Sequence, residues 1–106
     1  NIHGLIKGYG NPKLSIERVR DVAAAAGIPL VLHGGSGITD QDFIDAIKAG
    51  ISVIHISTEL RLADRQAMTK SLSENADELA PYKLSREAIT SVEAIVERYI
   101  KLFAGK

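Results

Sequence analysis

Two short apolar runs, residues 28–33 (IPLVLH) and 51–58 (ISVIHIST), constrain the fold of this chain more than any other feature. Each run follows a glycine and comes before a segment whose apolar residues recur at helical spacing. Branched apolar runs of this length are typical of parallel strands, and we expect the first run to be buried on both faces. Because strands and helices alternate, the sequence predicts right-handed strand–helix–strand units and therefore an α/β fold.

Four helical segments are predicted around these runs. Ser15 and Thr39 can cap the first two, and Gly27 and Gly50 suit their C-terminal ends. The third begins at Glu59 and is followed by a polar break over residues 73–83. The last covers residues 85–103 and closes the chain, with an apolar stripe made of Ala88, Val92, Ile95, Tyr99 and Leu102.

The predicted sheet is too small for a complete domain. Only two full strands are visible in 106 residues, and such a parallel sheet has open edges and cannot cover both of its faces. The chain also begins with Asn1 rather than methionine. We therefore expect residues 1–106 to be a single segment of something larger.

Charge and composition argue against several classes of protein. The 13 basic and 13 acidic residues cancel, which argues against nucleic-acid or membrane partners attracted by bulk charge. The chain has no cysteine, so neither a disulfide nor a thiolate metal site can form. No apolar run approaches the ~20 residues that a membrane span needs. These features agree with a cytoplasmic protein, which is the location we expect.

Histidines stand where the predicted strands end. His33 closes the first strand, and His55 lies near the end of the second, on the same face as Ser57. His3 comes before a loop and a helix, as the last residue of a truncated strand would. Because ligands of α/β proteins bind at the carboxyl ends of the strands, these side chains are candidate site residues.

The loop after His33 reads GGSG (34–37) and has almost no side chains. Its glycines let the backbone approach a ligand closely. Exposed amides there can form an anion nest, and the helix that starts near Thr39 adds its positive end. Ser36 and Thr58 can each add a hydroxyl, so phosphate is the simplest ligand.

Plainer interpretations stay open at this point. A strand-end histidine is more often a hydrogen-bonded structural residue than a metal ligand. A glycine-rich loop between a strand and a helix is often only a tight turn. The GGSG loop is neither a P-loop nor a G-x-G-x-x-G fingerprint.

The motifs together resemble the class II, zinc-dependent fructose-bisphosphate and tagatose-bisphosphate aldolases. NIHG (1–4), NPKLS (11–15), IPLVLHGGSG (28–37) and STELR (57–61) follow one another as in that family, and the resemblance extends to the final FAGK. It implies that the chain is the C-terminal part of a (β/α)8 TIM barrel, comprising the last two to three βα units and the closing helices. A barrel of ~250 residues would account for the open sheet.

The resemblance implies a reversible aldol cleavage of a ketose 1,6-bisphosphate to dihydroxyacetone phosphate and glyceraldehyde 3-phosphate, a step of carbohydrate metabolism such as glycolysis. One catalytic zinc ion would polarise the ketone, and a monovalent cation is compatible with the site. By resemblance, the metal ligands in this chain would be His3 and His33. The residues that would contact substrate or phosphate are Gly4, Gly34, Gly35, Ser36, His55, Ser57 and Thr58.

The resemblance also implies what this segment lacks. The family's third zinc histidine and its proton-transfer residues would come before residue 1, so no catalytic residue is expected here and the isolated chain should be inactive. We expect a homo-oligomer that binds a phosphorylated ketose, without nucleic-acid or membrane partners. The sequence does not separate fructose from tagatose bisphosphate.

The chain departs from the family pattern near the site. His55 stands where the family usually has Asn, and Ile6 where it usually has Tyr. The imidazoles of His3, His33 and His55 would end neighbouring strands ~4.8 Å apart, so His55 could act as a third zinc ligand. The alternative is that His55 contacts the substrate or supports a ligand.

A function of another class is also compatible with the sequence. The chain could be a non-catalytic module that binds a sugar phosphate or a metal and closes its sheet by self-association. The oligomeric state and a zinc-dependent aldolase assay would separate the two hypotheses.

Overall fold

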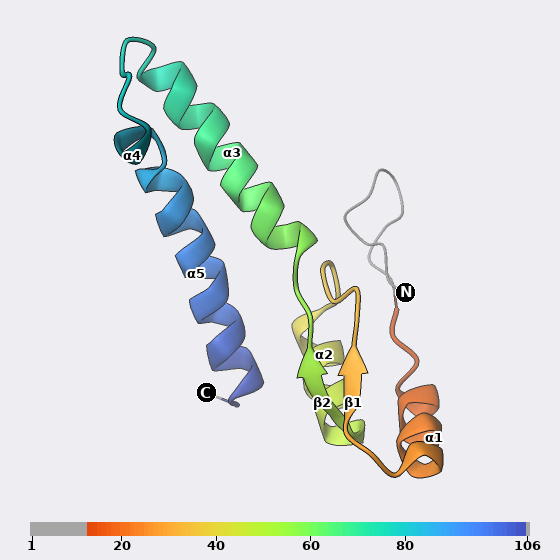
Figure 1. The fold of residues 1–106 in the computed structure, drawn as a ribbon. Coiled ribbons are helices and arrows are strands. Elements are labelled where there is room, and N and C mark those ends of the chain that lie inside the picture. Colours follow the sequence, from red (N-terminus) through yellow and green to blue (C-terminus); the bar gives the residue numbers. More distant parts are fainter. Residues whose placement is uncertain (1–12, 106) are drawn as a thin grey trace.

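The structure, a computed structural model, describes residues 13–105. His3 and Gly4, two of the predicted site residues, therefore lie outside the described residues. The elements form a mixed α/β arrangement (Figure 1) in the predicted order of helices and strands, except for a short helix that starts within the predicted polar break. In chain order they are α1 (Ile16–Ala26), β1 (Leu30–Leu32), α2 (Asp40–Ala49), β2 (Ile51–Ile54), α3 (Thr58–Glu74), α4 (Pro81–Leu84) and α5 (Arg86–Phe103).

The first two helices begin and end as their capping residues predict. Ser15 Oγ accepts a hydrogen bond from the Arg18 amide at 3.4 Å, and Thr39 Oγ1 accepts one from the Asp42 amide at 3.1 Å. Each bond satisfies an amide that the first helical turn leaves without a partner. α1 ends at Gly27, whose φ of 62° lies in the left-handed region that glycine adopts without strain.

β1 and β2 form a parallel pair in which Val31 lies opposite Val53. The strands contain 3 and 4 residues, so both are shorter than the apolar runs that predicted them. The prediction that the first strand is buried on both faces is wrong, because Val31 is 46% exposed. Val53 is 44% exposed on the same side. Within residues 13–105, these two valines mark a face of the sheet that the helices do not bury.

The core lies on the opposite face of the sheet. Phe43 of α2 is fully buried and clusters with Ile38 and with Tyr99 of α5. The rings of Phe43 and Tyr99 meet edge to face with centroids 5.7 Å apart, a geometry that aromatic pairs prefer. Ile54 and Ile56 pack against this cluster, so they face the covering helices. The core thus holds β2, α2 and α5 together beside the point where the strands end.

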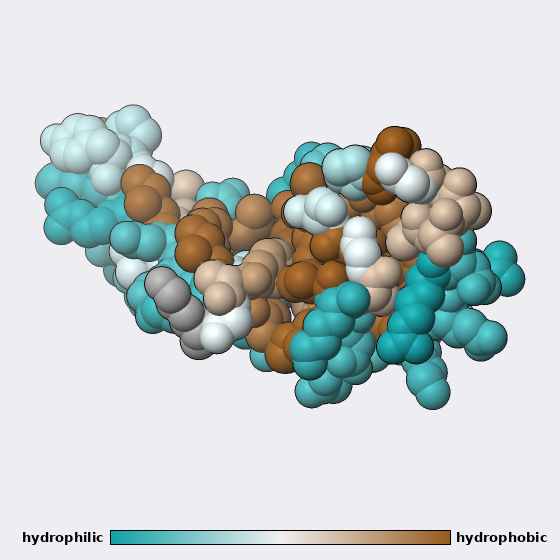
Figure 2. Space-filling model, turned by 90° about the horizontal axis from the view of Figure 1, so that it is seen from below, coloured by the Kyte–Doolittle hydropathy of each residue, from teal (hydrophilic) through white to brown (hydrophobic). Residues whose placement is uncertain are grey.

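α3 and α5 pack against each other and extend away from the sheet, with the one-turn helix α4 between them in sequence (Figure 1). The radius of gyration is 17.1 Å, whereas a compact domain of this length would have about 13 Å. Figure 2 shows hydrophobic side chains open to solvent on the face seen from below. The chain is therefore elongated and leaves apolar surface open. In residues 13–105, no helix is both long and apolar enough to cross a membrane.

Candidate functional site

His33 and His55 meet at the edge of the sheet where both strands end. Each residue follows directly after its strand, and the parallel pairing brings Leu32 opposite Ile54 just before them. The two Nδ1 atoms are 3.2 Å apart, and the rings stand nearly perpendicular with centroids separated by 4.6 Å. A hydrogen bond at this distance requires that one Nδ1 carries a proton and the other accepts it. Both side chains are exposed, so this pair is open to a ligand.

The backbone of His55 ties the two strand ends to the glycine-rich loop. Its amide donates to the Leu32 carbonyl at 3.0 Å, which continues the strand pairing beyond β2. Its carbonyl accepts from the Gly35 amide at 3.2 Å. A Cβ added at Gly35 would lie 2.7 Å from Ile56 Cδ1 and 3.2 Å from the His55 carbonyl oxygen. Gly35 is thus needed for close packing of the loop on β2, and its amide is already occupied.

Gly34 and Gly37 shape the rest of the loop. Their φ angles are 70° and 87°, conformations that strain other residues. Within the described part of the chain, no backbone carbonyl accepts from the amides of Gly34, Ser36 or Gly37. These three amides are the candidate donors to an anion, whereas the Gly35 amide already donates to the His55 carbonyl.

Ser36 joins the loop to the start of α3. Its side chain is buried, and its Oγ accepts a hydrogen bond from the Glu59 amide at 3.3 Å. Ser36 therefore caps an amide of the first turn of α3 from another part of the chain. Because Oγ accepts this bond, its own proton remains a donor for a ligand.

Ser57 and Thr58 stand at the N-terminal end of α3, next to Ser36. Ser57 occupies the N-cap position, but its side chain makes no capping hydrogen bond. Thr58 is the first helical residue, and both side chains are exposed. The helix end is therefore positive and accessible, which favours the binding of an anion.

The sequence did not identify an ion-pair cluster behind this site. Tyr99 donates a hydrogen bond to Glu59 Oε2 at 2.5 Å, and Arg98 lies between Glu59 and Asp40. Burial, with the bond to Glu59 next in size, raises the pKa of Tyr99 to about 12. Glu59 stands within the STELR motif, but nothing in the sequence links it to residues of the last helix.

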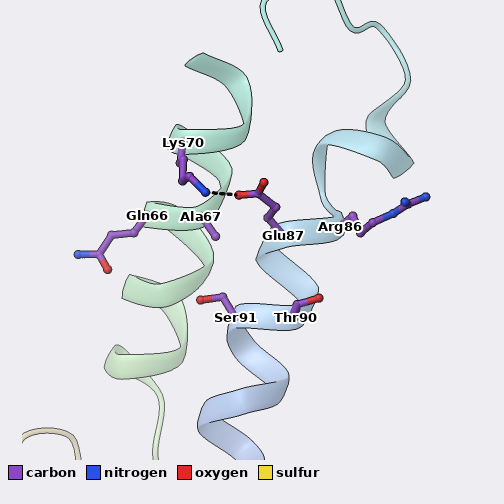
Figure 3. Close-up of a pocket in the computed structure, with 7 residues that line it drawn as sticks. All are labelled: Gln66, Ala67, Lys70, Arg86, Glu87, Thr90 and Ser91. Carbon is purple, nitrogen blue, oxygen red and sulfur yellow. Dashed lines mark hydrogen bonds and ion pairs between the residues drawn. The ribbon is translucent and has the colours of Figure 1, made fainter. Parts of the chain in front are cut away.

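Two further observations limit the site. In residues 13–105, no group of three or more His, Cys, Asp or Glu side chains gathers as metal ligands would. A separate groove between α3 and α5 holds an exposed ion pair of Lys70 and Glu87 at 3.3 Å (Figure 3). Lys70 is 12 residues along α3 from Thr58, about 18 Å of helix, so this groove is not part of the strand-end site.

Comparisons with known proteins agree with this arrangement. The whole chain, residues 1–106, matches the family model described as fructose-bisphosphate aldolase class-II. The chain is 38% identical over 105 residues to a 6-phospho-5-dehydro-2-deoxy-D-gluconate aldolase of Shouchella clausii, and the match covers 99% of this chain and 35% of that protein. A fructose-bisphosphate aldolase of Staphylococcus epidermidis is 34% identical over 103 residues, which cover 97% of this chain and 35% of the relative.

Solved structures agree as well. The YdjI aldolase from Escherichia coli K12 matches with a TM-score of 0.68 and 42% identity, over 87% of this chain and 34% of that chain. A putative fructose-1,6-biphosphate aldolase from Coccidioides immitis matches with a TM-score of 0.74 and 26% identity, over 98% of this chain and 35% of that one. This chain spans about a third of the length of each of these relatives. It belongs to the class II fructose-bisphosphate aldolase family.

Proposed function

We propose that the protein containing this chain is a zinc-dependent class II aldolase, which reversibly cleaves a ketose 1,6-bisphosphate to dihydroxyacetone phosphate and glyceraldehyde 3-phosphate. The observation that carries the proposal is the contact of His33 with His55 at adjacent strand ends, beside a loop of bare backbone. Family membership supports the reaction type. A (β/α)8 barrel is the proposed fold of the complete protein. The chain spans about a third of the length of its relatives, so it would supply only part of such a barrel.

His33 is the proposed zinc ligand of the described residues, with His3 as a second ligand from outside them. An exposed imidazole is a suitable zinc donor, and the chain has no cysteine that could compete. When bound, zinc would polarise the ketose carbonyl as a Lewis acid. Because residues 13–105 contain no group of three potential ligands, the proposal requires further ligands, His3 among them.

The GGSG loop and the start of α3 are the proposed phosphate site. The amides of Gly34, Ser36 and Gly37, together with the Ser36 hydroxyl, are the proposed donors from the loop. Ser57 and Thr58 would add hydroxyls at the positive end of α3. Gly35 would contribute by letting the loop lie close to β2, and Gly4 is proposed for the same phosphate from outside the described residues.

His55 is proposed to contact the substrate next to the metal. Its ring is exposed and its backbone is held by both Leu32 and Gly35, so its position is well defined. The hydrogen bond to His33 would set which nitrogen of each ring carries a proton. None of this chain's residues is proposed to transfer the reacting proton, so the segment binds and orients.

The ketose 1,6-bisphosphate is proposed from the family resemblance, and the relatives narrow the substrate only to a phosphorylated compound. The relatives are named for 6-phospho-5-dehydro-2-deoxy-D-gluconate, fructose bisphosphate and sulfofructosephosphate, and their identities to this chain are 38%, 34% and 34%. These values are too similar to favour one of the three. All three names share a phosphate group, which agrees with the anion site of the loop.

A chimera tests the proposal. The segment of the S. epidermidis aldolase that this chain matches would be replaced by residues 1–106, and cleavage of fructose 1,6-bisphosphate would be measured with and without zinc. We expect zinc-dependent cleavage that His33→Ala lowers about a hundredfold or more in kcat/KM. Lys70→Met, in the separate groove of Figure 3, is the matched control and should leave activity unchanged.

The isolated chain should cleave none of the sugar bisphosphate, because the proton-transfer residues are proposed to lie outside it. A folded chimera that cleaves no ketose 1,6-bisphosphate in the presence of zinc would refute the proposed activity. Cleavage by the isolated chain would refute the proposal that this segment only binds and orients.

A second candidate is a non-catalytic module that binds a sugar phosphate or a metal and self-associates. The exposed face marked by Val31 and Val53 favours it, since a second copy could cover this surface. Light scattering on the pure chain separates the two candidates, because a functional module should be a stable oligomer that binds zinc or phosphate without cleaving the sugar.

A further inference from the structure

An ion-pair cluster links the two helix starts of the candidate site to the last helix. It consists of Asp40, Glu59, Arg98 and Tyr99, and we call it the Arg98 cluster. Asp40 is the first residue of α2 and Glu59 the second residue of α3. Both acids therefore stand at the positive ends of the helices that follow β1 and β2, which are the ends nearest the proposed phosphate.

Arg98 of α5 pairs with both acids. Its Nη2 forms an ion pair with Asp40 Oδ1, and its Nη1 lies 3.8 Å from Glu59 Oε1. Its guanidinium carbon also lies 4.9 Å from the centre of the Tyr99 ring. A single cation from the last helix thus offsets two carboxylates from two other helices.

Tyr99 holds the Glu59 carboxylate from a second side. Its hydroxyl donates to Glu59 Oε2 at 2.5 Å, and its ring is buried against Phe43. The Glu59 side chain is only 26% exposed, so most of its contact with water is replaced by these partners. The carboxylate is therefore fixed toward α5.

The same residue also contacts the loop. The Glu59 amide donates to Ser36 Oγ at 3.3 Å, and Ser36 belongs to the proposed phosphate site. The carboxylate of Glu59 is therefore on a residue that is itself bonded to this site. A carboxylate that turned toward the loop would repel a phosphate dianion, because like charges at this range interact strongly in a partly buried site. In the structure, Arg98 and Tyr99 contact this carboxylate from α5 instead.

We infer that Arg98 and Tyr99 are positioning residues of the phosphate site, which hold the Glu59 carboxylate against α5 and offset its charge and that of Asp40. The ends of α2 and α3 then remain positive enough to bind the phosphate of the substrate. This inference rests on the proposed function, since it takes a substrate phosphate as the ligand of the GGSG loop. It assigns a role in ligand binding to residues of the last helix.

Titration with inorganic phosphate tests the inference, with the amide resonances of Gly34, Ser36 and Gly37 as the readout. We expect Arg98→Met to weaken phosphate binding about tenfold, because two carboxylates lose their cation. Adding Glu59→Gln to Arg98→Met should restore the affinity to within about threefold of the unaltered chain. Arg98→Lys, which keeps the charge, should bind phosphate nearly as well as the unaltered chain.

Lys101→Met is the matched control, because it also removes a cation from α5. Lys101 pairs with Glu97 and not with Asp40 or Glu59. This variant should leave phosphate affinity unchanged, and circular dichroism should report the same folded signal for every variant. If Glu59→Gln fails to restore binding to Arg98→Met, or if Arg98→Met binds as well as the unaltered chain, the inference is overturned. If the unaltered chain shows no shifts at the loop, the proposed phosphate site fails first and the inference fails with it.

Discussion

The Nδ1 atoms of His33 and His55 lie 3.2 Å apart, although 22 positions separate the two residues in the sequence. Two nitrogen ligands of a tetrahedral zinc ion, each about 2.0–2.1 Å from the metal, are about 3.3 Å apart. The spacing that lets one ring donate a hydrogen bond to the other is therefore close to the spacing that zinc requires. The spacing is therefore compatible with His55 as a zinc ligand and with His55 as a substrate contact beside the metal.

Zinc titration should separate the two roles of His55. If both rings bind the metal, His33→Ala and His55→Ala should each weaken zinc binding about tenfold or more, measured by competition with a chelator of known affinity. Ser57→Ala, also exposed at the end of the second apolar run, is the control and should bind zinc like the unaltered chain. Equal affinity of the unaltered chain and His55→Ala would exclude His55 as a ligand and leave it as a substrate contact.

Gly35→Ala should destabilise the chain by about 1–3 kcal/mol, because the added methyl group would lie 2.7 Å from Ile56 Cδ1. Ile56→Val removes that atom and by itself should cost about 1 kcal/mol. The double variant should therefore be more stable than the sum of the two single losses predicts, as measured by urea unfolding.

Gly27→Ala is a useful comparison for this double-mutant cycle of Gly35→Ala and Ile56→Val. A Cβ there meets no atom within 4 Å, but the φ of 62° remains unfavourable for alanine. Its loss of about 1 kcal/mol should show no coupling to Ile56→Val. Simple additivity of Gly35→Ala and Ile56→Val would mean that the steric contact at Gly35 does not limit the loop.

Local signals in the sequence predicted the helices and the strand ends well. Ser15 and Thr39 form the expected caps because a cap depends only on the next three residues. His33 and His55 come together because parallel pairing brings successive strand ends to one edge. The exposure of Val31 was missed, since the pattern of a strand indicates which side chains are apolar but not whether an element covers them.

The Arg98 cluster could not be predicted from the sequence for a related reason. Tyr99 and Glu59 are 40 positions apart, and Arg98 and Asp40 are 58 apart. Their contacts depend on how α5 packs across α2 and α3, which no local pattern encodes. Arg98 alone is indistinguishable in the sequence from the other charged residues of a solvated helix face. The roles of His3 and Gly4 remain predictions, as these residues lie outside the described part of the chain.

Tyr99 should make the stability of the chain fall at alkaline pH. Burial, with the hydrogen bond to Glu59, raises its pKa from 10.0 to about 12, so the folded chain binds this proton more tightly than the unfolded chain. The resulting stabilisation is fully present below pH 10 and is lost as the pH rises through about 12. Tyr99→Phe should remove this contribution to the slope of stability against pH between those values.

Urea unfolding at several pH values, together with absorbance of tyrosinate, checks this prediction. The unaltered chain should show one tyrosine that ionises near pH 12, and Tyr99→Phe should lack it. Tyr82→Phe is the control, because Tyr82 is 71% exposed. The same alkaline profile in the unaltered chain and in Tyr99→Phe would contradict a buried, hydrogen-bonded Tyr99.

The exposed sheet face should make the isolated chain self-associate. Val31 and Val53 lie opposite each other in the strand pairing and are 46% and 44% exposed, so they form an apolar surface beside unpaired strand edges. A second copy that covers this surface would bury both side chains, whereas a charge placed there would have to lose its water. Val31→Lys and Val53→Lys should therefore shift the chain toward monomer in light scattering.

Leu79→Lys is the matched control for self-association, because Leu79 is 90% exposed in the connection between α3 and α4, away from the sheet. It should leave the oligomeric state unchanged. If all three variants lowered association equally, general hydrophobicity rather than the sheet face would drive it. A monomeric unaltered chain at all concentrations would argue against the self-associating module, because its open sheet face would then have no copy of itself to cover it.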